Sequence, residues 1–444
     1  MKKTLYILPL LALGLQFAAC SSDEGSIFDK SAAERLEEGK KNYETALTAD
    51  GGRWALEYFA NYDEPGYVFV LDFKPDNSVT FHADHIWIDN VYQSEKSLWE
   101  VINDDGNVLT FNSYNNLFHV FASPEDITGP NSPRDPATGD EINELGYGHN
   151  GDYEFMLMGE KDGYQRLRGK KRGLVARLTR LDADTDPEEY LGGIRALRTQ
   201  FGSKFPVLKL TETATGAVYD VTGLSFGVPS VVPENSTSPA SRTVSGNGII
   251  TYAGFRFMEP LEVVREDNST WELAELTWAD ADGALVCDGV RLAAPVAGVN
   301  LVDSRYSWLL DKETMSAALT AAHDAASQGL QAQAGNSFDL RNVVFGFNSN
   351  AGAISFSITT YAGRRLCRDF GTIETNADGT EVTIALTSAN KASSDFDATV
   401  PAYTAFKQLL TGTFKVENAG AFKPETVKFT SLTNPDISFS VNVQ

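Results

Sequence analysis

Short runs in which hydrophobic and polar positions alternate dominate the chain. Between Tyr67 and Phe73 every second side chain is an aromatic ring or a leucine, which is the period of a β-strand with one buried face. Lys74-Pro75-Asp76-Asn77 then supplies turn residues before the next apolar run, Val79–Phe81, so this segment predicts a β-hairpin. Similar runs recur at short spacing to the end of the chain. They predict a mainly β fold of antiparallel meander, barrel or sandwich domains with a few peripheral helices.

Four segments have the helical period instead. The first begins at Ser31, where Glu34 completes a capping box, and the second at Asp186, where Pro187 takes the first helical position. Apolar spacing predicts the other two helices over residues 312–327 and 402–410.

Changes in this pattern divide the chain. Residues 31–204 predict an N-terminal β domain with flanking helices, and residues 205–444 a C-terminal, mostly β domain. Two stretches rich in turn-forming residues, 123–151 and 229–246, lack a hydrophobic period and are interpreted as loops. Residues 117–121 are interpreted as a strand.

The start of the chain has the composition of an export signal. Two lysines precede an apolar run from Leu5 to Ala19 that is too short to span a bilayer. The run ends in Phe17-Ala18-Ala19-Cys20, which resembles a bacterial lipobox. We therefore predict a lipoprotein signal peptide at 1–19, lipidation of Cys20, and an acidic tether at 20–30 on an outer-membrane, surface-exposed protein. An ordinary secretory signal is the alternative.

Charge narrows the range of partners. The formal net charge is -23, and removal of the two lysines of the leader makes it -25. A surface this acidic repels nucleic acid and anionic lipid headgroups, so we expect no nucleic-acid partner and membrane attachment through the lipid. The one basic cluster, Arg166–Arg172, is interpreted as a solvated hairpin end in preference to an anion site.

Acylation of Cys20 leaves Cys287 and Cys367 as the one pair that could form a disulfide. Both lie in strand-like segments. A bridge and two buried free thiols are equally compatible with the sequence.

Several short motifs match catalytic signatures without the structural context that these need. Gly146–Gly151 has the spacing of a dinucleotide fingerprint, but a strand is predicted after it where a helix is required. Gly223–Gly227 has the spacing of a nucleophile elbow, but Pro229 and Pro233 exclude the helix that should follow. We therefore predict no cofactor and no catalytic residues.

The candidate metal-binding motifs also lack a residue or a geometry that metal binding needs. Asp182–Asp186 carries three carboxylates in the spacing of a calcium loop, but Pro187 stands where glycine is needed, and capping of a helix by Asp186 explains them better. His82 and His85 are three positions apart in an expected strand and would face opposite sides. No metal site is predicted.

Four longer segments and the lipobox resemble uncharacterised lipoprotein families of Bacteroidetes, whose genes accompany nutrient importers of the SusC/SusD type. The segments are Gly52–Tyr58, Leu109–His119, Gly151–Phe155 and Leu410–Phe414. The resemblance covers most of the chain after Cys20. It implies a domain of unknown function that works beside an outer-membrane transporter complex, and it implies no reaction. Residues 31–204 are also similar to lipocalin-like lipoprotein domains, in which a Gly-x-Trp opens the barrel.

The best candidates for a ligand-binding surface are aromatic and polar residues of the N-terminal domain: Tyr114, Asn116, His119, Trp87 and Trp99. Aromatic faces with a few polar groups suit sugar and peptide ligands, although core packing is the commoner reason for such residues.

We expect a non-catalytic ligand-binding or accessory subunit of a nutrient-uptake system, with a glycan or peptide as ligand. A secreted hydrolase of glycans or peptides and a structural or adhesive surface protein are the alternatives. Paired carboxylates about 5–9.5 Å apart would favour the hydrolase. An aromatic-lined pocket would favour binding, and featureless convex sheets would favour a structural role.

Overall fold

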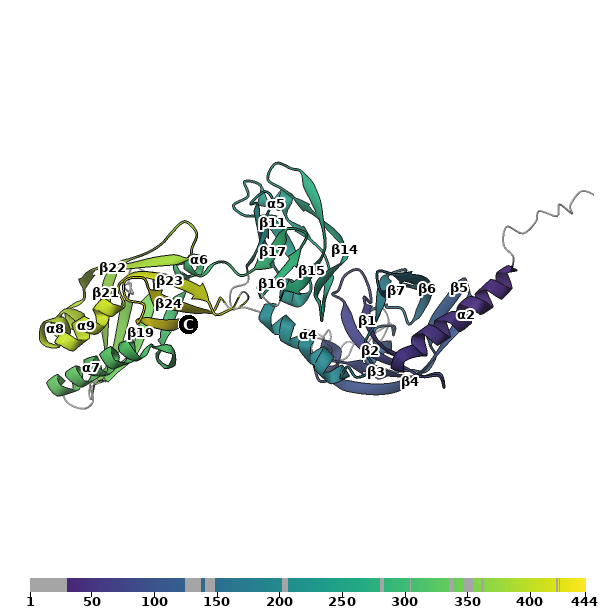
Figure 1. Ribbon diagram of the computed structural model, residues 1–444, viewed down its shortest axis with the longest axis horizontal. Helices are drawn as coiled ribbons and strands as arrows, with labels where there is room; N and C mark the ends of the chain where they lie inside the picture. Colours follow the sequence, from purple (N-terminus) through teal and green to yellow (C-terminus); the bar gives the residue numbers. More distant parts are fainter. Residues whose placement is uncertain are drawn as a thin grey trace, which may run out of the picture.

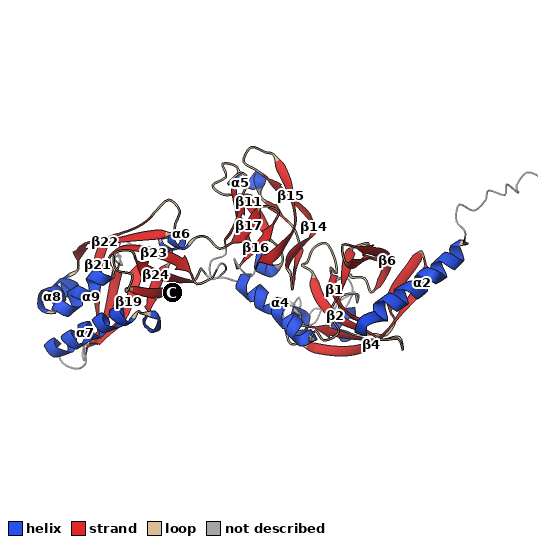
Figure 2. Cartoon of the chain, in the orientation of Figure 1, coloured by secondary structure: helices blue, strands red, loops and turns tan. Residues whose placement is uncertain are grey.

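The strands of the protein form three antiparallel sheets that lie in a row (Figure 1). The computed structural model describes residues 30–123, 137–139, 148–201, 207–279, 283–303, 305–334, 339–346, 354–360, 363–420, 422 and 424–444. Strands predominate over helices (Figure 2), so the predicted mainly β, antiparallel fold is confirmed. The signal peptide, Cys20 and the acidic tether up to residue 29 lie outside the described residues, as does most of 123–151.

The first sheet is a closed barrel of eight strands in sequential order. Strand β1 pairs with both β2 and β8, and Trp54 lies opposite Leu71 on one side and Arg180 on the other. The strands are β1 (Arg53–Tyr58), β2 (Tyr67–Phe73), β3 (Ser78–Ala83), β4 (Gln93–Asp104), β5 (Gly106–Phe111), β6 (Glu154–Lys161), β7 (Tyr164–Gly169) and β8 (Val175–Arg180). The helical segments of this part are α2 (Ala32–Thr48), η1 (Ala49–Gly51), η2 (Ile86–Ile88) and α3 (Asn116–His119).

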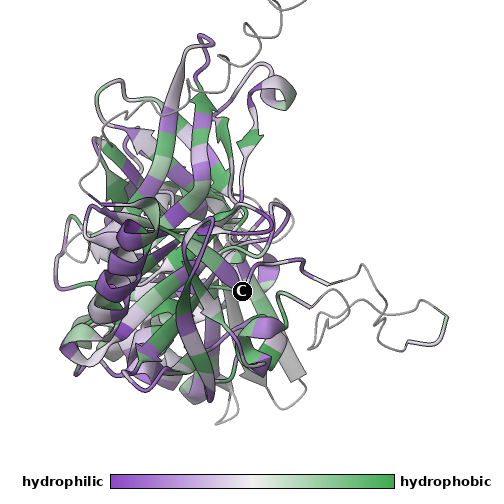
Figure 3. Ribbon diagram, turned by 90° about the vertical axis from the view of Figure 1, so that its right-hand side faces the viewer, coloured by the Kyte–Doolittle hydropathy of each residue, from purple (hydrophilic) through white to green (hydrophobic). Residues whose placement is uncertain are grey.

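Aromatic side chains fill the inside of this barrel. The ring centroids of Phe69, Phe81 and Phe118 lie 5.0–6.3 Å apart, at edge-to-face and stacked angles that such rings prefer. None of the three is more than 1% exposed. Hydrophobic and hydrophilic residues alternate along the strands, as one buried face requires (Figure 3). The barrel interior is therefore a packed core.

Trp54 fastens helix α2 to the barrel. Its indole Nε1 donates to the carbonyl oxygen of Leu47 at 2.8 Å, and the guanidinium of Arg180 lies 4.2 Å from its ring centroid. Arg180 also donates to the carbonyl oxygens of Ala46 and Ala49 at 2.7 and 2.8 Å. These bonds satisfy carbonyl groups that the end of a helix leaves without partners. The N-terminus of α2 has the predicted capping box of Ser31 and Glu34.

The second sheet has nine strands in the order β12-β11-β10-β9-β17-β16-β15-β14-β13. They are β9 (Leu208–Glu212), β10 (Val218–Thr222), β11 (Ser230–Pro233), β12 (Val244–Ser245), β13 (Gly248–Thr251), β14 (Gly254–Val264), β15 (Thr270–Ala279), β16 (Ala284–Cys287) and β17 (Val290–Ala293). Helix α4 (Pro187–Phe201) leads into this sheet from the first barrel, and it begins at the predicted N-cap, Asp186, which accepts from the backbone N–H groups of Glu188 and Glu189. Two short helical segments, η3 (Leu224–Phe226) and α5 (Pro239–Arg242), complete this part.

The third sheet is again a closed barrel of eight strands. Its strands are β18 (Ser307–Asp311), β19 (Asp339–Gly346), β20 (Ile354–Thr360), β21 (Gly363–Thr375), β22 (Glu381–Ala389), β23 (Gly412–Asn418), β24 (Thr426–Ser431) and β25 (Ser438–Val443). The helical segments are α6 (Ala297–Leu301), η4 (Lys312–Thr314), α7 (Ala317–Ala334), α8 (Lys391–Thr399) and α9 (Pro401–Leu409). The last three helices lie at the end of the row opposite to α2 (Figure 1).

Two local predictions were wrong. Residues 117–121, interpreted as a strand, belong to the short helix α3 and the turn after it, because the Asn115 side chain caps the N–H groups of Leu117 and Phe118. The stretch 229–246, interpreted as a loop, contains strands β11 and β12 and helix α5. These strands are only four and two residues long, too short for alternation to be visible in the sequence.

An ion pair between neighbouring strands anchors the first barrel to the segment that leads to α4. Arg53 of β1 donates from Nε and Nη2 to the two carboxylate oxygens of Asp72 at 2.7 and 2.8 Å, and from Nη1 to the carbonyl oxygen of Thr185 at 2.5 Å. His82 lies 3.3 Å from the same carboxylate. Burial opposes ionisation of Asp72, but the hydrogen bonds of Arg53 and His82 outweigh it, so its pKa lies well below the usual 3.8.

We expect Asp72→Asn to lower the free energy of unfolding of the first barrel at pH 7 by roughly 2–3 kcal/mol, because it breaks a largely buried pair. A carboxyl group with a depressed pKa stabilises the fold above its unfolded-state pKa of about 3.9 and loses this effect below it. The difference between wild type and variant should therefore shrink as the pH falls below about 4. Urea unfolding at several pH values measures it. Asp184→Asn, which removes an exposed carboxylate, is the control. A difference that persists unchanged at pH 3 would contradict the assignment.

Candidate functional site

A pocket of about 400 Å³ lies between the first barrel and the second sheet. Its walls come from the start of β2, the segment after β3, the last turn of α4, η3 and β13. The lining residues are Pro65, Gly66, Tyr67, His85, Ile86, Asn90, Arg198, Ser225, Phe226, Gly227, Gly248 and Ile250. Its size and its mainly apolar lining fall in the range of small-molecule sites, which occur preferentially at domain interfaces.

Direct contacts between the two parts hold the pocket walls together. Arg256 of β14 donates from Nε to a carboxylate oxygen of Glu57 of β1 at 2.7 Å, and its guanidinium lies 5.3 Å from the centroid of the Phe59 ring. Burial lowers the pKa of Arg256, and Glu57 opposes this effect. Beside the pocket, the backbone N–H of Gly66 donates to the carbonyl oxygen of Gly248 at 2.9 Å. The pocket thus lies at a junction that direct polar contacts hold together.

Arg198 is the charged group of this pocket. It lies in the last turn of α4, is partly buried, and has no hydrogen bond or ion pair with the described part of the chain. Burial lowers its pKa, and the negative charge of Asp84 opposes the shift. Burying a cation without a partner is costly, so such a group is an expected site for an anion.

The nearby acid is already engaged. Asp84 has a buried carboxylate whose Oδ2 lies 2.8 Å from Nη1 of Arg195, and burial raises the pKa of this carboxyl. A small hollow next to the pocket is lined by Asp84 and Arg195 together with Arg198. Among the charged side chains that line the pocket and this hollow, one carboxylate stands against two guanidinium groups, while the Glu64 carboxylate lies behind the wall, where it contacts Tyr67 and His149.

His85 and Tyr67 provide neutral polar groups in the wall. Nε2 of His85 donates to the carbonyl oxygen of Leu117 at 2.9 Å, and burial lowers the pKa of the ring to about 4, so the imidazole is neutral near pH 7. The Tyr67 hydroxyl accepts from Nε1 of Trp87 and donates to Glu64, at 2.9 Å in both cases. The positive charge of the pocket therefore belongs to arginine and does not depend on histidine protonation.

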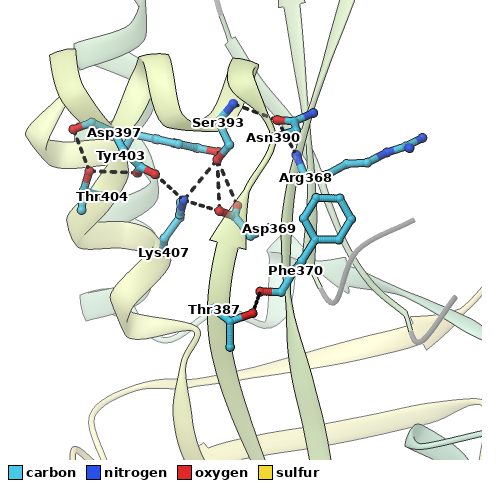
Figure 4. Close-up of polar contacts among 10 residues, drawn as sticks. All are labelled: Arg368, Asp369, Phe370, Thr387, Asn390, Ser393, Asp397, Tyr403, Thr404 and Lys407. Carbon is cyan, nitrogen blue, oxygen red and sulfur yellow. Dashed lines mark hydrogen bonds and ion pairs between the residues drawn. The ribbon is translucent and has the colours of Figure 1, made fainter. Parts of the chain in front are cut away.

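A second site, in the third barrel, contains a cation, Lys407, that is buried as deeply as Arg256. Nζ of Lys407, from α9, donates to Asp369 at 2.5 Å, to Asp397 at 2.8 Å and to the Ser393 hydroxyl at 3.1 Å (Figure 4). Ser393 also bonds to the Tyr403 hydroxyl at 3.1 Å. A depression of about 470 Å³ between α9 and β22 has Asp369, Asp397 and Lys407 in its wall.

This cluster is built for stability. All three ammonium hydrogens of Lys407 have acceptors, and Ser393 has no exposed surface from which its hydroxyl could attack a substrate. Burial raises the pKa of Asp369, although Lys407 and Ser393 oppose the shift. The network ties α8 and α9 to β21, and it leaves no donor of Lys407 for a ligand.

We expect Lys407→Met to destabilise the third barrel by about 3–5 kcal/mol, because it leaves the buried Asp369 and the partly exposed Asp397 without their counterion. Hydrogen exchange of α8, α9 and β21 should accelerate more than that of the first barrel. Lys415→Met, which breaks an exposed pair with Glu417, is the matched control and should change stability by less than about 0.5 kcal/mol. Unchanged exchange in α8 and α9 of the Lys407 variant would show that the network is not structural.

Three of the sequence-predicted binding residues lie together at helix α3. Tyr114 is exposed, and its ring lies 5.3 Å from that of His119. His119 is buried, accepts at Nδ1 from the Asn115 N–H at 3.1 Å, and lies 3.2 Å from the Phe111 carbonyl oxygen. Asn116 donates to the Glu95 carboxylate. None of these three lines the interdomain pocket.

The two predicted tryptophans lie apart from each other. Trp99 is 3% exposed, and its Nε1 lies 3.1–3.2 Å from the carbonyl oxygens of Lys74 and Ser78. Trp87 is half-buried and bonded to Tyr67, so it supports the wall of the interdomain pocket. Arg198, the main charged residue of the pocket, was missed because in the sequence it is one basic residue among several on an amphipathic helix.

The remaining motifs fall into different environments. Ser225, in the Gly223–Gly227 motif, lies in the three-residue segment η3 after strand β10, and strand β11 follows it where a nucleophile elbow needs an α-helix. Ser225 lines the interdomain pocket. His82 contacts Asp72 and Tyr92, whereas His85 bonds to Leu117, so the two rings have separate partners. Within the described ranges, no group of three or more His, Cys, Asp or Glu side chains could hold a metal ion. Part of Gly146–Gly151 lies outside those ranges.

Cys287 and Cys367 lie in the second and third sheets, and no disulfide joins them. Among the helices that the structure describes, none has both the length and the apolar composition to cross a bilayer.

The chain is thus a mainly β protein with a pocket at its first interdomain junction. It belongs to the family described as Domain of unknown function (DUF4302), which matches residues 24–278, more than half of the chain. The match spans the first barrel, α4 and most of the second sheet, and it includes every residue that lines the interdomain pocket. No curated protein sequence matches the chain.

Solved structures offer only distant likenesses. The β chain of DNA polymerase III from Streptococcus pneumoniae TIGR4 is 10% identical over 91% of this chain and 98% of that chain, with a TM-score of 0.13. A double mutant of the vaccine antigen Transferrin Binding Protein B from Haemophilus parasuis Hp5 is 8% identical over 88% of this chain and 75% of that chain, with a TM-score of 0.12. Scores this low carry no argument about function.

Proposed function

We propose that this protein is a non-catalytic binding protein that holds a small ligand in the pocket between its first barrel and its second sheet. The observation that carries the proposal is the partly buried guanidinium of Arg198, which has no hydrogen bond or ion pair with the residues that the structure describes, in a mainly apolar pocket of about 400 Å³. A pocket of this kind combines apolar surface for affinity with a polar group for orientation. The filled barrel interior leaves the junction as the better place for a ligand.

The cellular setting belongs to the same proposal. The lipobox before Cys20 supports lipid anchoring in the outer membrane, with the acidic tether and the folded part facing outward. The resemblance to lipoproteins that accompany SusC/SusD-type importers supports a role as an accessory subunit that delivers its ligand to a transporter. The similarity of residues 31–204 to lipocalin-like lipoproteins agrees with the sequential eight-stranded barrel.

Binding is tested with 8-anilinonaphthalene-1-sulfonate, a fluorescent probe with an apolar body and one negative charge. We expect saturable binding at one site per chain in the wild type and its loss in Ser225→Trp, whose indole fills the pocket. Ser241→Trp, on the exposed helix α5, is the matched control and should bind the probe as the wild type does. Equal binding by both variants would place the probe elsewhere and remove the support for this pocket.

The anchor is tested by Cys20→Ala in cells that process bacterial lipoproteins. Only a thiol at the cleavage site can accept the lipid, so the variant should lose labelling by radioactive palmitate and leave the membrane fraction. Cys287→Ala should keep both properties. A Cys20→Ala protein that stays in membranes after a high-salt wash would exclude the proposed anchoring.

A further inference from the structure

The chemistry of the interdomain pocket defines the class of its ligand more narrowly. We propose that the pocket binds a compact organic monocarboxylate, with the carboxylate on Arg198 and an aromatic or aliphatic body against the apolar wall. This inference rests on the proposed binding function and adds the identity of the recognised group.

Arg198 fits a carboxylate because a guanidinium offers paired N–H donors in the geometry of two carboxylate oxygens. Its donors have no acceptor among the described side chains or backbone groups, so an anion would not have to displace an existing bond. Arg195 already has Asp84 at 2.8 Å and the carbonyl oxygen of Asn90 at 3.1 Å, both at Nη1, whereas no donor of Arg198 has a bond to the described residues.

The surroundings favour a single negative charge over two. Arg198 lies in the last turn of α4, where the helix dipole places partial negative charge, so each negative charge of a ligand is disfavoured there and must be offset by a cation. Of the charged side chains that line the pocket and the hollow beside it, two are cationic and one is anionic, the Glu64 carboxylate lies behind the wall, and the whole chain carries -23. A phosphate dianion would thus bring more negative charge than the pocket neutralises.

The rest of the wall selects an apolar body of limited size. Tyr67, Ile86 and Ile250 present apolar surface, and the Phe226 ring lies at the pocket with 79% of its surface exposed. An aromatic ring left in water gains by stacking on a ligand ring or chain. A volume of about 400 Å³ lies near the lower end of ligand pockets, which suits one or two rings and excludes a long oligosaccharide.

The test compares probes of one shape and different charge on the full-length protein by isothermal titration calorimetry. 2-Naphthoate should bind at least about tenfold more tightly than the neutral 2-naphthylmethanol, because only the first can form charge-assisted bonds with Arg198. 2-Naphthyl phosphate should bind more weakly than 2-naphthoate. Tighter binding of the phosphate ester, or equal binding of acid and alcohol, would overturn the monocarboxylate assignment.

Arg198→Gln identifies the group responsible. It should weaken 2-naphthoate at least about tenfold and leave 2-naphthylmethanol unchanged, while Arg166→Gln, on the exposed face of β7, changes neither. The melting temperature of ligand-free Arg198→Gln should equal or exceed that of the wild type, because an unpaired charge has been removed. A marked fall in melting temperature would make Arg198 structural and overturn the proposal.

Failure of this inference and failure of the binding function give different results. If both naphthyl probes bind equally and Ser225→Trp abolishes both, the pocket is a ligand site but does not select a carboxylate. If no probe binds and Ser225→Trp behaves as the wild type, the proposed function fails together with the ligand class.

Discussion

The rest of the structure depends on how the first barrel and the second sheet are joined. Arg256 reaches across the junction to Glu57, and both side chains are largely removed from water, at 7% and 15% exposure. Gly66 lets the backbones approach, because a Cβ at this position would lie 2.7 Å from a ring atom of Phe59 and 2.8 Å from Ile249. A buried ion pair resists displacement, since separating the charges would leave each without a counterion in a region of low dielectric. The pocket is therefore a fixed property of the fold.

Two buried cations of this protein have opposite surroundings. One stabilises the fold, and we propose that the other binds a ligand. Lys407 finds three acceptors within 3.1 Å and holds two helices on the third barrel. Arg198 has no such partners within the described ranges, although burial lowers its pKa. A satisfied network lowers the free energy of the fold, whereas an unsatisfied charge raises it unless a ligand completes the site. The aromatic side chains that fill the first barrel also favour the junction as the ligand site, because the barrel interior is a packed core.

The sequence correctly predicted those elements that depend on interactions between neighbouring residues. The hairpin at Tyr67–Phe81, the capping box at Ser31 and the N-cap at Asp186 all form as predicted, because turn residues and side-chain caps act within a few positions. Short elements were not predicted from the sequence. Helix α3 occupies four residues in an apolar segment, where the period of a helix and that of a strand cannot be told apart. Its cap, Asn115, was visible in the sequence and could have indicated the helix.

By itself, the sequence determined the mainly β fold, the starts of helices α2 and α4, and the acidic character of the chain. These follow from side-chain period, turn chemistry and composition, which are properties of neighbouring residues. Only the tertiary structure decided that His85, Arg198 and Ser225 share one pocket, since they come from three segments more than 130 positions apart at the extremes. It also decided which charges are paired. Whether a buried guanidinium is structural or free to bind an anion depends on acceptors that distant strands bring within about 3 Å, and no local pattern records that distance.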